Sequence, residues 1–176
     1  MSCLRFLQKL LNLIMLLSVP LCIHAQDTLG LKRPAYKLNL AVDKKTFYEE
    51  DIKSTPYILP DTTIQLYPGE TVYIDVTEEN GVIKKMLAVP VIKDSAKTIT
   101  IRFWQEKQGK VHSMTMLKMT NPFPYQFVYK AGIFLLSQKR WVSTDVYPVE
   151  PGLLGFETWP DIITSIALSG WTFKHQ

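Results

Sequence analysis

The feature that most constrains the fold of this chain is a rhythm of short runs in which polar and apolar residues alternate, punctuated by proline, glycine and asparagine. A period of two residues places apolar side chains on one face of a β-strand, whereas an amphipathic helix repeats every ~3.6 residues. The rhythm extends from Tyr36 to Phe173, with turn signals about every ten residues. It predicts an all-β fold, namely an antiparallel β-sandwich of about eight strands, immunoglobulin-like in type.

Three turn signals divide the middle of the chain. Pro68-Gly69 has the two central residues of a type II turn, Asn80-Gly81 is the pair that favours a tight hairpin, and Gln108-Gly109 forms a third turn. The run from Val111 to Met119 is apolar on both faces, which predicts a central strand covered on both sides. The other strands flanking these turns are expected to share one inner apolar face: Val72, Ile74, Val76, Ile99, Ile101 and Phe103.

Two proline-containing segments are expected to be connections. Residues 44–61 are polar and contain Pro56 and Pro60, so we expect a long connection or an edge excursion there. The segment Asn121 to Pro124 contains two prolines, which remove two amide donors and exclude a central strand.

The last third of the chain predicts three further strands, at 127–133, 141–147 and 162–173. Residues 162–173 also contain apolar residues at helical spacing, but Gly170 and the β-branched content favour a strand. Trp104, on the strand before Gly109, is the candidate for a buried core tryptophan.

The first 25 residues have the three parts of a secretory signal peptide. Arg5 and Lys9 form a basic start, Leu10 to Leu17 form most of an apolar core, and Ala25 supplies the small residue that signal peptidase requires. We expect cleavage after Ala25, which leaves one domain, residues 26–176.

Two alternatives for this leader are less favoured. A retained membrane anchor needs ~20 apolar residues, whereas Asn12 and Pro20 interrupt the run. A lipoprotein signal would place the lipid on Cys22, but the residue before it is Leu21 rather than a small residue.

Loss of the leader changes both the cysteine count and the charge. Cys3 and Cys22 are the two cysteines, so the mature domain has no disulfide. Two of the 20 basic residues also leave, which sets 18 against 16 acidic residues and gives a net charge of +2. Because basic residues nowhere form a long run, we expect no binding to nucleic acid or to anionic lipid, and no membrane span after cleavage.

Catalysis is disfavoured by the residues that remain. The mature chain has only His112 and His175, contains no Gly-x-Ser-x-Gly sequence and lacks cysteine. We expect His112 to be solvated, and the acid pair Glu157 and Asp161 to face water while the rings around it pack on the sandwich. Ligand spacings for metals are also missing from the sequence. We therefore expect no enzyme activity, no metal and no cofactor.

Aromatic residues are the strongest indication of binding. Exposed tryptophan and tyrosine rings stack on sugars or anchor protein contacts. Tyr147 and Trp159 are the first candidates for a ligand site, because they flank the turn-rich stretch 148–157. Trp141 and Trp171 complete the candidate set.

Two functions remain open at this point. The first is an exported, non-catalytic module that binds a protein partner or assembles in the cell envelope, in the periplasm or outside the cell. The alternative is a carbohydrate-binding module that uses exposed aromatic side chains. Pairing of sheet edges is one route to the first function, although Pro34, Lys37, Lys44 and Lys45 are typical of a strand edge protected from pairing.

Overall fold

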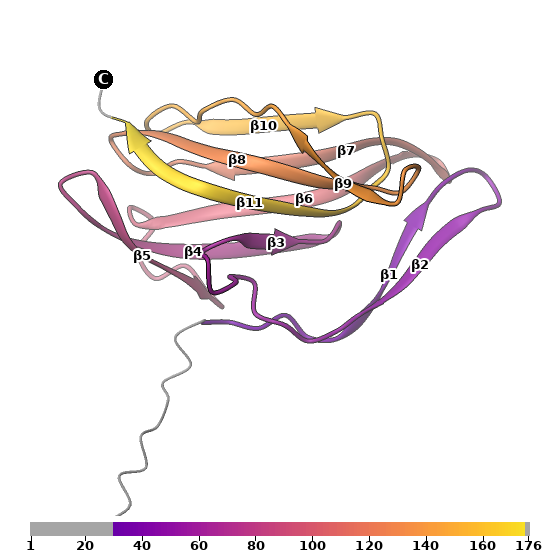
Figure 1. Ribbon diagram of the computed structural model, residues 1–176, viewed down its shortest axis with the longest axis horizontal. Helices are drawn as coiled ribbons and strands as arrows, with labels where there is room; N and C mark the ends of the chain where they lie inside the picture. Colours follow the sequence, from indigo (N-terminus) through magenta and orange to yellow (C-terminus); the bar gives the residue numbers. More distant parts are fainter. Residues whose placement is uncertain (1–29, 175–176) are drawn as a thin grey trace, which may run out of the picture.

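The computed structural model describes residues 30–174, so the predicted signal peptide and its cleavage site at Ala25 lie outside the described residues. The described chain is all β, with two antiparallel sheets packed as a sandwich and a separate two-stranded hairpin (Figure 1). This confirms the predicted all-β sandwich. The strands are β1 (Tyr36–Ala41), β2 (Phe47–Ile52), β3 (Ile64–Leu66), β4 (Glu70–Glu79), β5 (Val82–Val89), β6 (Thr98–Gln108), β7 (Val111–Thr120), β8 (Gln126–Leu135), β9 (Arg140–Thr144), β10 (Leu154–Trp159) and β11 (Ile163–Lys174).

The two sheets enclose one main core. The five-stranded sheet has the order β10-β7-β6-β4-β5, and the four-stranded sheet has the order β3-β11-β8-β9. The predicted inner faces of β4 and β6 are confirmed, because alternate side chains on both strands are at most 2% exposed: Val72, Ile74, Val76, Ile99, Ile101 and Phe103. They face the apolar side of the four-stranded sheet, which includes Phe127, Ile133, Ile166 and Leu168. Burial of these alternating residues is the main force that holds the sheets together.

The predicted turns are confirmed by backbone geometry. Gly69 has a φ of 102°, and the amide of Glu70 donates to the carbonyl of Tyr67 at 3.1 Å. Asn80 and Gly81 both have positive φ, 54° and 74°, as the two central residues of a type I′ hairpin turn require. Local sequence therefore sets the entry to β4 and the turn between β4 and β5, whose pairing shifts register once between Thr77 and Glu78.

The prediction of a connection over residues 44–61 is wrong for its first half. Residues 47–52 form β2, which pairs with β1 from Tyr36 opposite Ile52 to Ala41 opposite Phe47. The hairpin is closed by Asp43, whose Oδ1 accepts hydrogen bonds from the amides of Lys45 (2.8 Å) and Thr46 (2.9 Å). The apolar pattern of β2 is weak because one of its faces, which includes Phe47, is exposed to solvent.

The β1–β2 hairpin leans away from the sandwich body at one end of the molecule (Figure 1). Its buried side chains, Leu38, Leu40 and Ile52, form a second small core with Tyr67 and Ile162. The hairpin is also tied to β6, because Gln105 accepts from the amide of Ala41 at 2.9 Å and donates to its carbonyl at 2.8 Å.

Two predictions about β6 and β7 are wrong. β7 is central in its sheet, but only its inner face is covered, since Met114 is 43% exposed. Trp104 is half-buried on the outer face of β6, and the core tryptophans are instead Trp159 and Trp171. The apolar pattern on both faces of β7 therefore arises because its outer apolar side chains lie at the surface of the five-stranded sheet.

Two further expectations concern the last third of the chain. Residues 163–174 form a strand and not a helix, as the β-branched content indicated. β9 ends at Thr144, three residues before the predicted end of that strand at Tyr147. Within residues 30–174 there is no apolar helix of the length that a bilayer crossing demands.

Replacement of Phe103 tests the assignment of the main core. Phe103 is fully buried, so Phe103→Ala should lower the free energy of unfolding by about 3–5 kcal/mol through lost burial and a residual cavity. The matched control is Phe156→Ala on the outer face of the same sheet, where the change should stay within about 0.5 kcal/mol. Urea denaturation measures both, and equal losses would contradict the assigned faces.

Candidate ligand-binding groove

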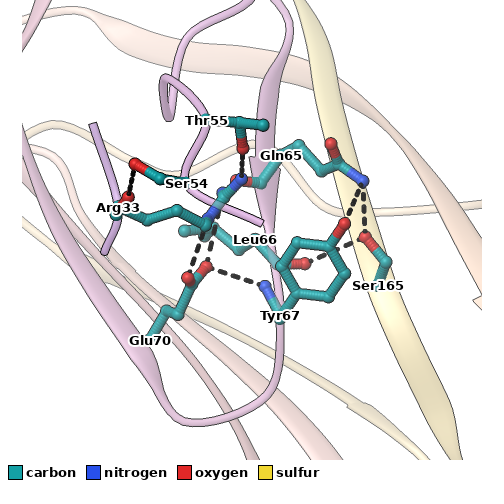
Figure 2. Close-up of polar contacts among 8 residues, drawn as sticks. All are labelled: Arg33, Ser54, Thr55, Gln65, Leu66, Tyr67, Glu70 and Ser165. Carbon is teal, nitrogen blue, oxygen red and sulfur yellow. Dashed lines mark hydrogen bonds and ion pairs between the residues drawn. The ribbon is translucent and has the colours of Figure 1, made fainter. Parts of the chain in front are cut away.

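A buried ion pair between Arg33 and Glu70 ties the chain before the hairpin to the start of β4. The side chains are 0% and 7% exposed, and Arg33 Nε donates to Glu70 Oε1 at 2.9 Å. Arg33 also donates from Nη1 to Thr55 Oγ1 at 2.6 Å and from Nη2 to the carbonyl of Gln65 (Figure 2). The buried guanidinium thus has several acceptors, as a charge removed from water requires.

Aromatic side chains enclose this ion pair. The guanidinium carbon of Arg33 lies 4.7 Å from the ring centre of Tyr57 and 5.0 Å from that of Tyr67, within cation–π range. Glu70 Oε2 in turn accepts from the amide of Tyr67 at 2.9 Å. The Tyr36 hydroxyl is buried beside them without a hydrogen-bond partner among the described residues. Its pKa is raised by burial and then by the negative charge of Glu70.

Gln65 of β3 connects the ion pair to the outer surface of the four-stranded sheet. Its carbonyl accepts from Arg33, while its side-chain Nε2 donates to the Tyr67 hydroxyl at 3.2 Å and to Ser165 Oγ at 3.0 Å (Figure 2). Ser165 Oγ donates to the carbonyl of Leu66 at 3.2 Å. The same network that anchors the hairpin therefore fixes the positions of Gln65 and Tyr67.

A β-bulge in β11 brings Ser165 to this surface. Ile163 and Ile166 both point into the main core although they are three residues apart, and the pairing with β8 shifts register between Ile163 and Ser165. The extra residue allows Ser165 to lie on the outer face, where Gln65 reaches it.

A groove lies between β2 and this outer face. Its volume is about 260 Å³, and a neighbouring hollow of about 320 Å³ shares Glu50, Gln65 and Tyr67 with it. Together they fall in the range of small-molecule sites, about 300–1,000 Å³. Four aromatic and four polar residues line the groove: Tyr48, Tyr67, Phe134, Trp141, Glu50, Gln65, Thr164 and Ser165.

Trp141 provides the exposed aromatic surface of the groove. It is 46% exposed, and it lies opposite Phe134 in the β8–β9 pair, with ring centres 5.6 Å apart and the rings edge to face at 77°. On the other side, the Tyr48 hydroxyl donates to Glu50 Oε2 at 2.8 Å. Burial, this hydrogen bond and the charge of Glu50 raise the pKa of Tyr48 to about 12. A tyrosine thus stays neutral beside a carboxylate at physiological pH.

The structure places only one of the four predicted ligand residues in this groove, namely Trp141. Trp159 is 8% exposed, and its indole Nε1 donates to Thr144 Oγ1 at 3.0 Å. Trp171 is also buried, stacks on Phe127 and Tyr129, and donates to the carbonyl of Thr62 at 3.0 Å. Both rings therefore belong to the core, so Trp159, one of the two first candidates, offers no exposed ring to a ligand.

Tyr147 is 80% exposed, as expected, but it lies between β9 and β10 and does not line the groove. Its amide donates to Glu157 Oε1 at 2.7 Å, so Glu157 does not simply face water. Partial burial raises the pKa of Glu157, and the hydrogen bond from Tyr147 opposes this shift. Phe156, expected to pack on the sandwich, is exposed instead.

His112 has a structural position rather than the solvated one predicted for it. Its Nδ1 lies 3.0 Å from Gln105 Nε2, and its Nε2 lies 3.0 Å from the carbonyl of Pro160. Because the amide nitrogen of Gln105 can only donate, the neutral ring carries its proton on Nε2 and donates to Pro160. Among residues 30–174, no group of three or more histidine, cysteine or acidic residues is placed to hold a metal ion.

Most of the groove was missed in the sequence because its residues come from five separate segments. Tyr48 and Glu50 lie in the stretch interpreted as a connection, and Gln65 belongs to a three-residue strand. One local signal was present, since Asp43 followed by Lys45 and Thr46 is typical of a side-chain-closed turn and would have predicted a hairpin there.

Removal of one partner tests the buried ion pair. Glu70→Gln leaves the Arg33 charge buried without a counter-charge, so the free energy of unfolding should fall by about 3–5 kcal/mol. Arg33→Met combined with Glu70→Gln leaves no buried charge and should recover part of this loss. Urea denaturation measures both variants, and a single-variant loss below about 1 kcal/mol would contradict the role of the pair.

Alkaline pH provides a second test of the same region. Tyr36, Tyr48, Tyr57 and Tyr67 have raised pKa values, chiefly through burial. The unfolded chain releases these protons near pH 10 while the folded chain retains them, so the stability they contribute is complete below about pH 10. The free energy of unfolding should therefore fall as the pH rises from about 10 to about 12, and Tyr36→Phe should weaken that dependence. Tyr147→Phe is the surface control, and equal effects of both changes would refute the expectation.

Comparison with known proteins gives no match for this chain: no family model fits it, and no similar curated protein or solved structure was found. The immunoglobulin-like type of the sandwich therefore stays a prediction.

Proposed function

We propose that this chain is an exported, non-catalytic carbohydrate-binding protein that holds a glycan in the groove between β2 and the four-stranded sheet. The observation that carries the proposal is the half-exposed ring of Trp141, which packs against Phe134 and lines the groove together with polar side chains. Sugar rings have apolar C–H faces and a rim of hydroxyl groups, so a site for them needs an aromatic platform and hydrogen-bonding groups beside it.

The polar groups of the groove match the rim of a sugar. Glu50 Oε2 already accepts a hydrogen bond from the Tyr48 hydroxyl, which leaves Glu50 Oε1 to accept from a sugar hydroxyl. The side-chain amide nitrogen of Gln65 is held by Tyr67 and Ser165, which leaves its oxygen as a second acceptor. The Tyr67 hydroxyl accepts from Gln65 and has its own proton to donate. Two acceptors and one donor thus lie in a single groove.

The groove is also held in a fixed shape. Tyr67 and Gln65 are positioned by the Arg33 network, and Trp141 is restrained by Phe134. Side chains restrained before binding lose less conformational entropy when a ligand arrives. This lowers the entropic cost of binding a polar ligand such as a glycan.

A protein-interaction or envelope-assembly role is the second candidate function. A specific observation favours it, namely the exposure of Leu154 (52%) and Phe156 (53%) on β10, an edge strand of the five-stranded sheet. Large apolar side chains exposed side by side are typical of protein contact surfaces.

Isothermal titration calorimetry with a panel of soluble neutral oligosaccharides tests the glycan proposal. At least one of them should bind, and Trp141→Ala should weaken its binding by about tenfold or more, because a central aromatic platform is removed. Glu50→Gln keeps the shape of the groove and should cause a smaller loss.

Tyr147→Ala is the matched control, because it removes an exposed ring outside the groove and should leave the affinity unchanged. Absence of binding to the whole panel, or equal affinity of the Trp141→Ala variant and the unchanged protein, would refute the proposal.

A further inference from the structure

The outer face of β10, β7 and β6 has an ordered arrangement of exposed side chains. Register places Phe156 opposite Lys118, Lys118 opposite Arg102, and Met116 opposite Trp104. Leu154 lies on the same face at one end of these rows, and Met114 lies at the other. The face therefore presents two cations in its middle, with apolar side chains on either side along the strands.

Each cation lies against an aromatic ring of the same face. The guanidinium carbon of Arg102 is 4.6 Å from the ring centre of Trp104, and Lys118 Nζ is 5.6 Å from that of Phe156. These contacts restrain the long basic side chains along the sheet. The charged groups are thus held in place before any partner arrives.

The two cations have no counter-charge within the described chain. Neither Arg102 nor Lys118 forms an ion pair in residues 30–174, although they are direct cross-strand neighbours. Like charges opposite each other in a sheet are destabilising, so the isolated face retains an unrelieved repulsion. Glu106, an acid on the same face, accepts a hydrogen bond from the Trp104 indole instead.

Large apolar side chains of this face are exposed to solvent. Leu154, Phe156 and Met114 are between 43% and 53% exposed. Beside Leu154 lies a hollow of about 270 Å³ whose lining includes Leu153 and Ile92, both exposed as well. Apolar patches of this kind mark interaction sites.

We propose that this outer face docks an acidic protein segment, in which carboxylate side chains pair with Arg102 and Lys118 and flanking apolar side chains cover Leu154, Phe156 and Met114. From the row of Leu154 to that of Met114 the face is about 20 Å long, which fits an extended segment of about six residues. The inference rests on the protein-interaction role and is independent of the glycan groove.

A protein segment fits this face better than other polyanions. Two cations bordered by apolar and aromatic side chains match a chain that alternates acidic and apolar residues, whereas a phosphate polymer needs a longer basic track. An anionic membrane needs either more charge or a second anchor. Charge complementarity at the centre and apolar contact at the ends together define the partner.

Fluorescence anisotropy of labelled synthetic peptides tests the inference on the full-length protein. The probe alternates glutamate with leucine and phenylalanine, and its counterpart carries lysine in place of every glutamate. The acidic peptide should bind, the basic peptide should not, and Arg102→Glu combined with Lys118→Glu should weaken binding by at least about tenfold. Arg102→Gln combined with Lys118→Gln should cause a smaller loss, and it replaces the first variant if charge reversal impairs folding.

Two controls show whether binding depends on the charges of this face. Lys44→Glu combined with Lys45→Glu makes the same change in net charge at the exposed hairpin turn and should leave peptide binding intact. Trp141→Ala removes the aromatic platform of the groove and should also leave peptide binding intact. A failure of the glycan proposal is therefore distinguishable from a failure of this inference.

Several outcomes would overturn the inference. They are absence of binding to the acidic peptide, equal losses in the two charge-reversal pairs, and binding to phosphatidylglycerol vesicles that the acidic peptide does not compete away. Binding of the basic peptide alone would keep an interaction role for the protein but refute the acidic partner.

Discussion

The ion pair of Arg33 and Glu70 is the interaction on which the placement of the hairpin and of the groove depends. It joins the segment before the β1–β2 hairpin to the corner between β3 and β4, and through the carbonyl and side chain of Gln65 it reaches β11. Two charges in a site this dry are stable only when all their partners are in place. The segment before the hairpin, the sheet corner and part of the groove lining therefore share one polar network.

The sequence predicted the sandwich and its turns well because both depend on local patterns. Alternation in β4 and β6 indicates their buried face, and Asn80-Gly81 indicates a hairpin by its backbone preference alone. Strand order could not be predicted in the same way, since it depends on pairing between residues far apart in the chain. β2 was missed because it lacks a strong apolar rhythm. One of its faces is exposed, and the contacts of its inner face are supplied by Tyr67 and Ile162.

The candidate site was predicted only in part, because it too depends on contacts between residues far apart in the chain. Composition led us to expect a ligand site built from exposed aromatic rings, yet it could not separate Trp141 at the surface from Trp159 and Trp171 in the core. An indole in the core needs a hydrogen-bond acceptor. The acceptor for Trp159 is Thr144, and the acceptor for Trp171 is Thr62, which lies in a connection far away in the sequence. Exposure of an aromatic ring is a property of the assembled sheets, so a single sequence without its fold leaves that distinction open.

The position of β11 has a consequence for the order in which the molecule can form. β11 is the last of the described strands, but it lies inside the four-stranded sheet, where it is the neighbour of both β3 and β8. Synthesis proceeds from the amino end, so β3 has no strand partner in its sheet until β11 has been made, and Gln65 waits for Ser165, 100 positions later. The groove is thus complete only once β11 is in place, and a chain without β11 leaves the edge of β8 open where the groove would lie.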